Sequence, residues 1–325
     1  MLRVTIKNIL LNSKLGEMIL NIYKSYKVKI VARNPQKVAN KIYKSIMNKD
    51  INWDNPKDLI EKIYWLQLYT DTSLWTLCAD KYKMREYVKS KGCYDLLPQL
   101  YGCWDNANDI DFSTLPNQFV LKSNNGCGQV LIVKDKTKLD INNTINTLNK
   151  WMRSKYGYID AQIHYTKIKP CIIAEEYLKN ENNPNETSLI DYKIWCFHGK
   201  PEFILVAYDR GKDNNGYYLS AYDLEWNNIS DIALNKNSKH HNGQTIKKPL
   251  CLSEMIKYAS ILSKDFPEVR VDFYETNGKL NIGELTFTSG HGSYNNKFYE
   301  YLGSKIDLSK VNKLGKINRP NISNY

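Results

Sequence analysis

The residues best suited to chemistry lie in the stretch VRVDFYETNGKLNIGELTF, at positions 269–287. Apolar residues alternate on either side of Asn277-Gly278, which predicts two strands joined by a tight turn. The turn length decides which side chains share a face of the hairpin. A two-residue loop puts Asp272 and Glu284 on opposite faces, whereas a three-residue loop from Thr276 to Gly278 puts them on the same face.

The three-residue loop gathers four polar side chains on one face: Arg270, Asp272, Glu284 and Thr286. Two carboxylates and an arginine are costly to bury without partners. Carboxylate oxygens suit a hard cation that bridges anionic oxygens, and an arginine adds further positive charge. The apolar residues between them favour a buried hairpin, so we expect a metal and anion site here. An exposed sheet face with incidental ion pairs is the alternative.

A second candidate is the stretch FVLKSNNGCGQVLIVKDK, at positions 119–136. Its segment Gly126-Cys127-Gly128 leads into an apolar run that reads as a strand. Walker and dinucleotide-binding loops lead into a helix, so the strand excludes both. What is left is a hairpin whose tip offers backbone N–H groups to phosphate, with Lys122 beside it as a point charge. A plain turn is the alternative.

The elements that must hold these residues fall into two regions. Apolar residues from Leu10 to Tyr26 have helical spacing, Pro35 interrupts the pattern, and Asn55-Pro56 predicts a further helix start. One more helix is expected from Ser73 to Ser90. Beyond it, helices are expected near 140–155 and 252–264, and strands at 118–122, 130–134, 171–178, 192–197, 202–208, 269–274 and 280–287. The predicted fold class is α+β, with mainly antiparallel strands.

The charge of the chain is concentrated at its ends. Residues 1–50 hold eleven Lys or Arg and two acidic residues, a balance of +9, and residues 303–325 carry +4, which leaves −1 of the total +12 for the middle. Helix faces exposed to solvent would account for this excess of positive charge without any partner. The alternative is that the ends dock on anionic lipid or on a polyanionic glycan. No nucleic-acid motif is present, so we expect no nucleic-acid partner. Seven cysteines without a CxxC pair predict reduced thiols and a cytoplasmic protein, with peripheral membrane contact left open.

Several stretches, taken in order, resemble the ATP-grasp superfamily, and most closely its TupA-like branch, found with polysaccharide and teichuronopeptide biosynthesis. Besides the two stretches above they are DKYKMREYV (80–88), IIAEEYL (172–178), DYKIWCFHGKPEFILVAYDR (191–210) and YDLEWN (222–227). The resemblance implies two α+β subdomains that grip ATP between them, at 73–175 and 176–325. A basic helical region at 1–72 precedes them.

The resemblance also implies how ATP is held. Two lysines would bind phosphate, the glycine hairpin would close over the triphosphate as a flap, and the end of the IIAEEYL strand would be the adenine linker. An aspartate would lie beside the ribose or a phosphate. The residues so assigned are Lys81, Lys122, Ser123, Gly126, Cys127, Gly128, Glu175, Glu176, Tyr177, Leu178 and Asp191.

The remaining assignments concern the metal and the reaction. Asp272 and Glu284 match carboxylates that bind Mg²⁺, and Thr286 stands where many relatives have an asparagine as a third ligand. Arg270 matches an arginine that stabilises the reacting centre. The substrate-side candidates are Lys193 and Arg210. The implied cofactors are therefore ATP and Mg²⁺.

The activity that the resemblance implies is a carboxylate–amine ligase acting through an acylphosphate. It would join an amino acid or similar amine to a carboxylate, such as a uronic acid of a bacterial surface polysaccharide or its precursor. Two alternatives stay open. One is a phosphotransferase acting on a glycan or small acceptor, and the other is a non-catalytic protein that docks on glycan or membrane.

Overall fold

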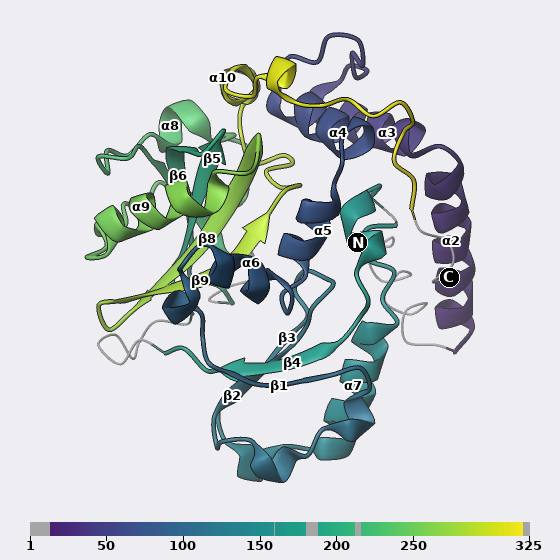
Figure 1. Cartoon of the computed structure of the whole chain (residues 1–325), viewed down its shortest axis with the longest axis vertical. Helices are drawn as coiled ribbons and strands as arrows, with labels where there is room; N and C mark the ends of the chain where they lie inside the picture. The colour runs from purple at the N-terminus through teal and green to yellow at the C-terminus, as the bar shows by residue number, and fades with distance from the viewer. Residues whose placement is uncertain (1–13, 159, 180–187, 212–215, 321–325) are drawn as a thin grey trace.

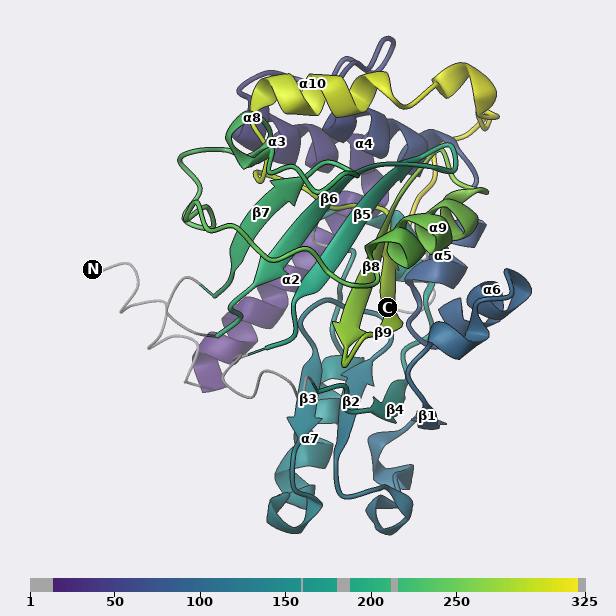
Figure 2. The ribbon, with the colours of Figure 1, turned by 90° about the vertical axis from the view of Figure 1, so that its left-hand side faces the viewer.

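A computed structural model describes residues 14–158, 160–179, 188–211 and 216–320 (Figure 1). Within these residues the chain forms two antiparallel sheets, with strand orders β1-β4-β2-β3 and β7-β6-β5-β8-β9. Helices accompany both sheets, which confirms the predicted α+β class. Figures 1 and 2 both place the first sheet below the second. None of the described helices is both long and apolar enough to cross a membrane.

The first helices of the described residues are α2 (Lys14–Arg33), α3 (Pro35–Met47) and α4 (Leu59–Tyr69). The predicted interruption at Pro35 is confirmed, because the Asn34 side chain caps α3 by accepting from the Lys37 N–H at 2.9 Å.

The predicted helix start at Asn55-Pro56 is wrong. Helix α4 begins after Asp58, whose side chain accepts from the Glu61 N–H at 3.0 Å. The Glu61 side chain accepts in return from the Asp58 N–H at 3.4 Å. This capping box satisfies two backbone donors at once, and asparagine at position 55 offers no such pair.

The single helix expected from Ser73 to Ser90 is also wrong. The structure has two short helices, α5 (Ser73–Ala79) and α6 (Met84–Ser90). Between them the Asp80 carboxylate accepts from the backbone N–H groups of Tyr82 and Lys83, at 2.9 and 3.2 Å. An aspartate that bonds its own following backbone favours a turn over a helix. Lys81 therefore lies in a turn, at the junction of the two helices.

The first sheet holds β1 (Leu100–Trp104), β2 (Phe119–Ser123), β3 (Val130–Val133) and β4 (Ile172–Glu176). One face packs against α7 (Ile141–Met152) through a core that includes Phe119, Leu121, Leu148, Ile172 and Ala174. The predicted strands β2, β3 and β4 are confirmed. Strand β1 escaped prediction because its sequence LYGCW contains a glycine, and every one of its residues is only half-buried.

The second sheet holds β5 (Asp191–Phe197), β6 (Lys200–Tyr208), β7 (Tyr218–Tyr222), β8 (Glu268–Thr276) and β9 (Lys279–Thr286). The four strands predicted here are confirmed. Strand β7 was not predicted, since a buried serine, Ser220, interrupts its apolar pattern and bonds the Gln244 carbonyl at 2.7 Å.

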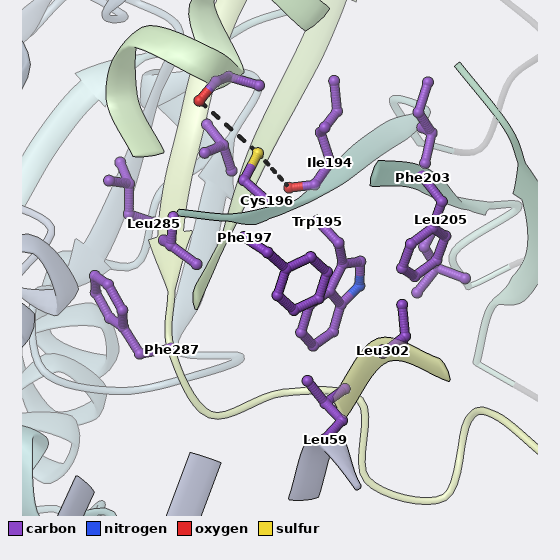
Figure 3. Close-up of a cluster of buried hydrophobic side chains, with 14 of the residues drawn as sticks. Leu59, Ile194, Trp195, Cys196, Phe197, Phe203, Leu205, Leu285, Phe287 and Leu302 are labelled. Atoms are coloured by element: carbon purple, nitrogen blue, oxygen red, sulfur yellow. Dashed lines mark hydrogen bonds between the residues drawn. The ribbon is translucent and has the colours of Figure 1, made fainter. Parts of the chain in front are cut away.

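Alternating residues of β5 face two different layers (Figure 3). The Cys196 thiol contacts the backbone carbonyl of Ala259, in α9 (Leu252–Ser263), with Sγ···O at 3.8 Å. On the other face the Trp195 ring lies 6.0 Å from that of Phe203, which packs edge-on against Phe298 of α10 (Asn296–Ser304) at 5.1 Å. The short α8 (Ser230–Ala233) follows β7.

Buried side chains of α3 to α6 belong to the same core as the second sheet. Trp75 of α5, for example, stacks on Phe287 just after β9, with ring centroids 5.0 Å apart. Helix α10 packs on α4, and Figure 2 shows α3, α4 and α10 gathered at one end of the second sheet. The contact from α5 therefore holds the end of β9 in place. The subdomain boundaries at 72 and 175 stay a prediction.

Candidate active site

The β8–β9 hairpin brings Asp272 and Glu284 directly opposite each other. Its loop is the two-residue Asn277-Gly278, with φ values of 53° and 76°, so the expected three-residue loop is wrong. The inference that a two-residue loop separates the carboxylates is wrong as well. An extra residue in β9, Gly283, forms a bulge that shifts the register by one. The shared face is therefore confirmed, but a bulge creates it.

Gly283 also meets a steric requirement. A Cβ at this position would lie 2.9 Å from Cε2 of Tyr274 and 3.3 Å from the carbonyl oxygen of Asp272. The bulge thus has no room for a larger side chain unless the tyrosine moves. The glycine in the sequence was the available signal for it.

Arg270 occupies the centre of this face. Its Nε donates to Oδ1 of Asp272 at 2.6 Å, and its Nη2 donates to Oδ2 at 2.7 Å. The same Nη2 lies 3.2 Å from Oε1 of Glu284 and 3.1 Å from Oγ1 of Thr286. The three residues predicted to bind metal therefore converge on one guanidinium nitrogen.

The line of alternating charges continues onto β5. The Lys193 ammonium lies 2.5 Å from Oδ2 of Asp191 and also contacts Asp272, the residue opposite it on β8. Arg210, just after β6, reaches the same Asp191 oxygen with its Nη2 at 3.0 Å. The candidates Lys193, Arg210 and Asp191 thus join the carboxylates in one continuous network.

The two carboxylates differ in their pKa values. Burial raises the pKa of Asp272 to about 6, against the opposing pull of Arg270 and Lys193. Burial acts the same way on Glu284, but Lys81, Lys193 and Arg270 outweigh it and lower its pKa to about 2. The Glu284 side chain is 38% exposed. It is therefore ionised, and solvent cations have access to it.

The donor set fits Mg²⁺ that arrives together with phosphate oxygens. In the described part of the chain no group of three or more His, Cys, Asp or Glu side chains is placed to hold a metal. Mg²⁺ does not need one, since one or two carboxylates plus substrate phosphates commonly bind it. Asp272 and Glu284 provide that pair. The Thr286 hydroxyl lies 3.1 Å from Oε1 of Glu284 and orients it.

In the first sheet the predicted Lys122 pairs with a buried glutamate. Its Nζ lies 2.7 Å from Oε2 of Glu175, and Nη1 of Arg85 lies 3.2 Å from Oε1. Sequence reasoning missed Arg85, although it lies in the DKYKMREYV stretch, four residues after Lys81. It is buried and also donates to the Pro98 carbonyl at 2.9 Å.

The role of residues 175–178 as the adenine linker stays a prediction. Glu175 and Glu176 lie in β4, with Tyr177 and Leu178 immediately after it. The Glu176 N–H donates to the Gln99 carbonyl at 2.9 Å, so this amide is already paired. The side chain of Glu175, the first residue of the linker, is the counterion of Lys122 and Arg85 described above.

The face of the first sheet that carries Lys122 is exposed at its β3 edge, where the residues are apolar. Register pairs place Val120, Glu175, Val130 and Ile132 on the same face as this lysine. Val130 and Ile132 are 43% and 51% exposed, whereas the opposite face packs against α7. A half-exposed apolar surface beside a cation suits a flat, partly apolar ligand with a charged end.

The predicted flap forms the tip of the β2–β3 hairpin. The Lys81 ammonium donates to the Gly126 carbonyl. The backbone N–H of Lys81 donates to the Asn124 carbonyl at 3.2 Å. Gly128 has a φ of 72°, a conformation that favours glycine. Ser123 bonds the Gln129 side chain across the base of the loop, and Cys127 at the tip is exposed.

Asn124 anchors this loop, which sequence reasoning did not find. Its side chain is 1% exposed and donates to Asp80 Oδ1 and to the Lys169 carbonyl, both at 2.9 Å. It accepts in turn from the Cys171 N–H at 2.8 Å. The base of the flap is thereby tied to the turn that carries Lys81. An asparagine in a loop is too common a feature to reveal this.

The flap and the β8–β9 hairpin both affect the pKa of Tyr156. Burial raises the pKa of Tyr156, and Cys127 of the flap and Glu284 of β9 raise it further. The Tyr156 ring meets that of Tyr165 edge-on at 4.9 Å. Lys81 in turn lowers the pKa of Glu284. The two predicted halves of the site therefore lie within electrostatic reach of each other.

A family model described as TupA-like ATPgrasp matches residues 61–307, a span that includes both sheets. Among solved structures, D-alanine–D-alanine ligase from Bacillus anthracis complexed with ATP is 17% identical and has a TM-score of 0.47; the match covers 74% of this chain and 68% of that one. L-amino acid ligase from Bacillus licheniformis is 14% identical, with coverages of 68% and 45% and a TM-score of 0.41. The ADP complex of purK, N5-carboxyaminoimidazole ribonucleotide synthetase, is 14% identical, with coverages of 71% and 51% and a TM-score of 0.41. No curated protein matches the chain.

Proposed function

The chain belongs to the TupA-like ATP-grasp family, and we propose that it is an ATP-dependent carboxylate–amine ligase that acts through an acylphosphate. The observation that carries this proposal is the Arg270 network. A guanidinium held between two carboxylates, with Lys81 near enough to lower the pKa of one of them, provides charges of both signs beside the glycine loop that we propose to bind phosphate.

In the first step a carboxylate oxygen of the acceptor attacks the γ-phosphorus of ATP, and the bond to the β–γ bridging oxygen breaks. ADP leaves with that electron pair, and an acylphosphate forms. Lys81, Lys122 and the N–H groups of the flap would hold the phosphates in line and offset their charge. Bound Mg²⁺, held by Asp272 and Glu284, would supply further neutralisation of the phosphate oxygens.

In the second step an amine attacks the acyl carbon, and a tetrahedral intermediate forms. The C–O bond to the phosphate then breaks, so that the amide and free phosphate result while the amine loses a proton. Arg270 would stabilise the negative oxygen of the intermediate. Neither step needs a side-chain nucleophile, which agrees with a site built from charges and backbone groups.

The flap has a defined task in this scheme. An acylphosphate in open water hydrolyses, so the loop from Gly126 to Gly128 would close over it and exclude water. Asn124 fixes the base of the loop, so closure would involve its exposed residues Cys127 and Gly128.

For the substrates we propose an amino acid or similar amine, and a uronic acid carboxylate of a bacterial surface polysaccharide or its precursor. The resemblance to the TupA-like branch supports this choice. A precursor carried on membrane lipid would bring the enzyme to a membrane surface, and the +9 balance of residues 1–50 supports peripheral contact there.

The test is a product analysis with amino acids and uronic acids supplied in pairs with Mg-ATP. The ligase predicts equal amounts of ADP, free phosphate and amide. A phosphorylated acceptor without free phosphate would establish the phosphotransferase instead. If Glu284→Gln matches the wild type in both turnover and Mg-ATP binding, the proposed site is refuted. Asp231→Asn, an exposed carboxylate on α8, is the matched control.

A further inference from the structure

Helix α2 exposes four large apolar side chains that no described part of the chain covers. Met18, Ile19, Ile22 and Tyr26 are 60%, 50%, 59% and 62% exposed. Single exposed apolar residues are ordinary, but four of them on one side of the same helix form a patch. Figure 1 shows α2 at the edge of the molecule. We call these four residues the α2 stripe.

The stripe lies away from the core. Successive residues of an α-helix turn by about 100°, so Met18, Ile22 and Tyr26 fall within a sector about 80° wide and Ile19 extends it to about 100°. The buried residues of α2, such as Val28 and Val31, fall on the opposite side. There Val31 packs with residues of α3 and α4 in a separate small core. The helix is therefore anchored by its buried residues from Val28 onward, and the stripe runs from Met18 to Tyr26 on the opposite side.

Positive charge accompanies the stripe. Helix α2 contains five Lys or Arg and one Glu. Lys29 and Arg33 are exposed, and at about 100° per residue both fall within the sector of the stripe, one and two turns beyond Tyr26. This side of α2 thus combines an apolar section with a cationic end. The helix lies within residues 1–50 of the chain, which carry a net charge of +9.

The apolar stripe and its neighbouring positive charges indicate which kind of partner binds this side of α2. A second copy of the chain would bring +9 against +9, which opposes association. An anionic lipid surface offers acyl chains to the apolar residues and negative headgroups to the cations at the same time. We infer that α2 is an interfacial helix that docks the protein on an anionic lipid surface through the α2 stripe. This assigns the peripheral membrane contact proposed above to α2, and it does not depend on the ligase chemistry.

The experiment compares binding to vesicles of phosphatidylcholine with binding to vesicles of equal parts phosphatidylcholine and phosphatidylglycerol, by flotation without nucleotide. The test variant is Met18→Gln, Ile22→Gln and Tyr26→Gln, since glutamine keeps helix propensity while it removes apolar surface. The control is Ile232→Gln with Leu250→Gln, which are 68% and 80% exposed but lie outside α2.

The full-length wild type and the control are expected to float with the anionic vesicles, and less so at high salt. The triple variant should bind about tenfold or more weakly, because three apolar side chains no longer enter the membrane. Its thermal midpoint, its sedimentation coefficient and its Mg-ATP affinity should match the wild type.

Equal binding by variant and wild type would overturn the inference, as would equal binding to both kinds of vesicle. A lower thermal midpoint would overturn it too, since the stripe would then be covered by the chain itself. A change in sedimentation coefficient would assign the stripe to a second copy. None of these results touches the proposed nucleotide site, because Mg-ATP affinity is measured separately on the same variant.

Discussion

Replacing Glu284 by glutamine removes one negative charge from the β8–β9 face while keeping the size of the side chain. The wild-type carboxylate is ionised at neutral pH, since nearby cations lower its pKa to about 2. Its partners inside the protein are Nη2 of Arg270 at 3.2 Å and the Thr286 hydroxyl at 3.1 Å, and it is 38% exposed. The amide oxygen of glutamine can accept from the same donors. The charge itself is lost, although solvent screens a side chain that is 38% exposed. We therefore expect the variant to lose about 1–2 kcal/mol of stability at neutral pH.

The effect on Mg-ATP should be much larger. The attraction between two unit charges 4 Å apart is about 1 kcal/mol in water and about 4 kcal/mol near a protein surface. A half-exposed carboxylate lies between these limits, so losing its charge beside a dication should cost about 2 kcal/mol. That corresponds to a loss of about thirtyfold in affinity.

Isothermal titration with and without Mg²⁺ measures this directly. The expected result is weaker binding of Mg-ATP by Glu284→Gln, with little change for ATP in chelator. The Asp231→Asn control should behave as the wild type in both titrations. Unchanged Mg-ATP affinity in Glu284→Gln would refute the assignment of this residue as a metal ligand. Equal losses with and without Mg²⁺ would refute it as well.

Further predictions concern stability. Asp272→Asn should cost about 3 kcal/mol or more in urea unfolding, because Arg270 and Lys193 then lack their buried anion; a cost like that of Glu284→Gln would contradict this. Gly283→Ala should cost about 1–3 kcal/mol, since the new Cβ would lie 2.9 Å from the Tyr274 ring, and no change would mean that the ring moves freely. Because the folded protein lowers the pKa of Glu284, the ionised carboxylate stabilises the fold, and this contribution is fully present at pH values above the ordinary pKa of 4.5. The wild type should therefore lose stability relative to Glu284→Gln as pH falls from about 4.5 to about 2, and a constant difference would refute the shift.

Most of the strands could be predicted because their apolar runs are bounded by turn residues. The strand from Val130 to Val133, which excluded helix-based phosphate loops, is present in the structure. The shared face of Asp272 and Glu284 was predicted for the wrong reason, since a bulge at Gly283 creates it. Bulge and loop length both shift register by one, and pattern alone cannot separate them.

The contacts that anchor the site could not be predicted because they join segments far apart in sequence. Asn124 meets Asp80, and Arg85 meets Glu175. Each pair depends on how the first sheet lies against the α5–α6 turn, which no local pattern encodes. The break at Asp80 was open to prediction, since an aspartate side chain can accept from the backbone N–H groups two and three residues later and so favours a turn.

The claim that the flap and the β8–β9 hairpin hold one nucleotide can be tested through Cys127. This thiol is exposed at the tip of the flap, whereas the other cysteines are buried or half-buried. The measurement is the rate of Cys127 alkylation with and without Mg-ATP, in the wild type and in Glu284→Gln at the same nucleotide concentration. The account predicts that Mg-ATP protects Cys127 in the wild type and protects it much less in the variant. Equal protection in both proteins, or none in the wild type, would contradict it.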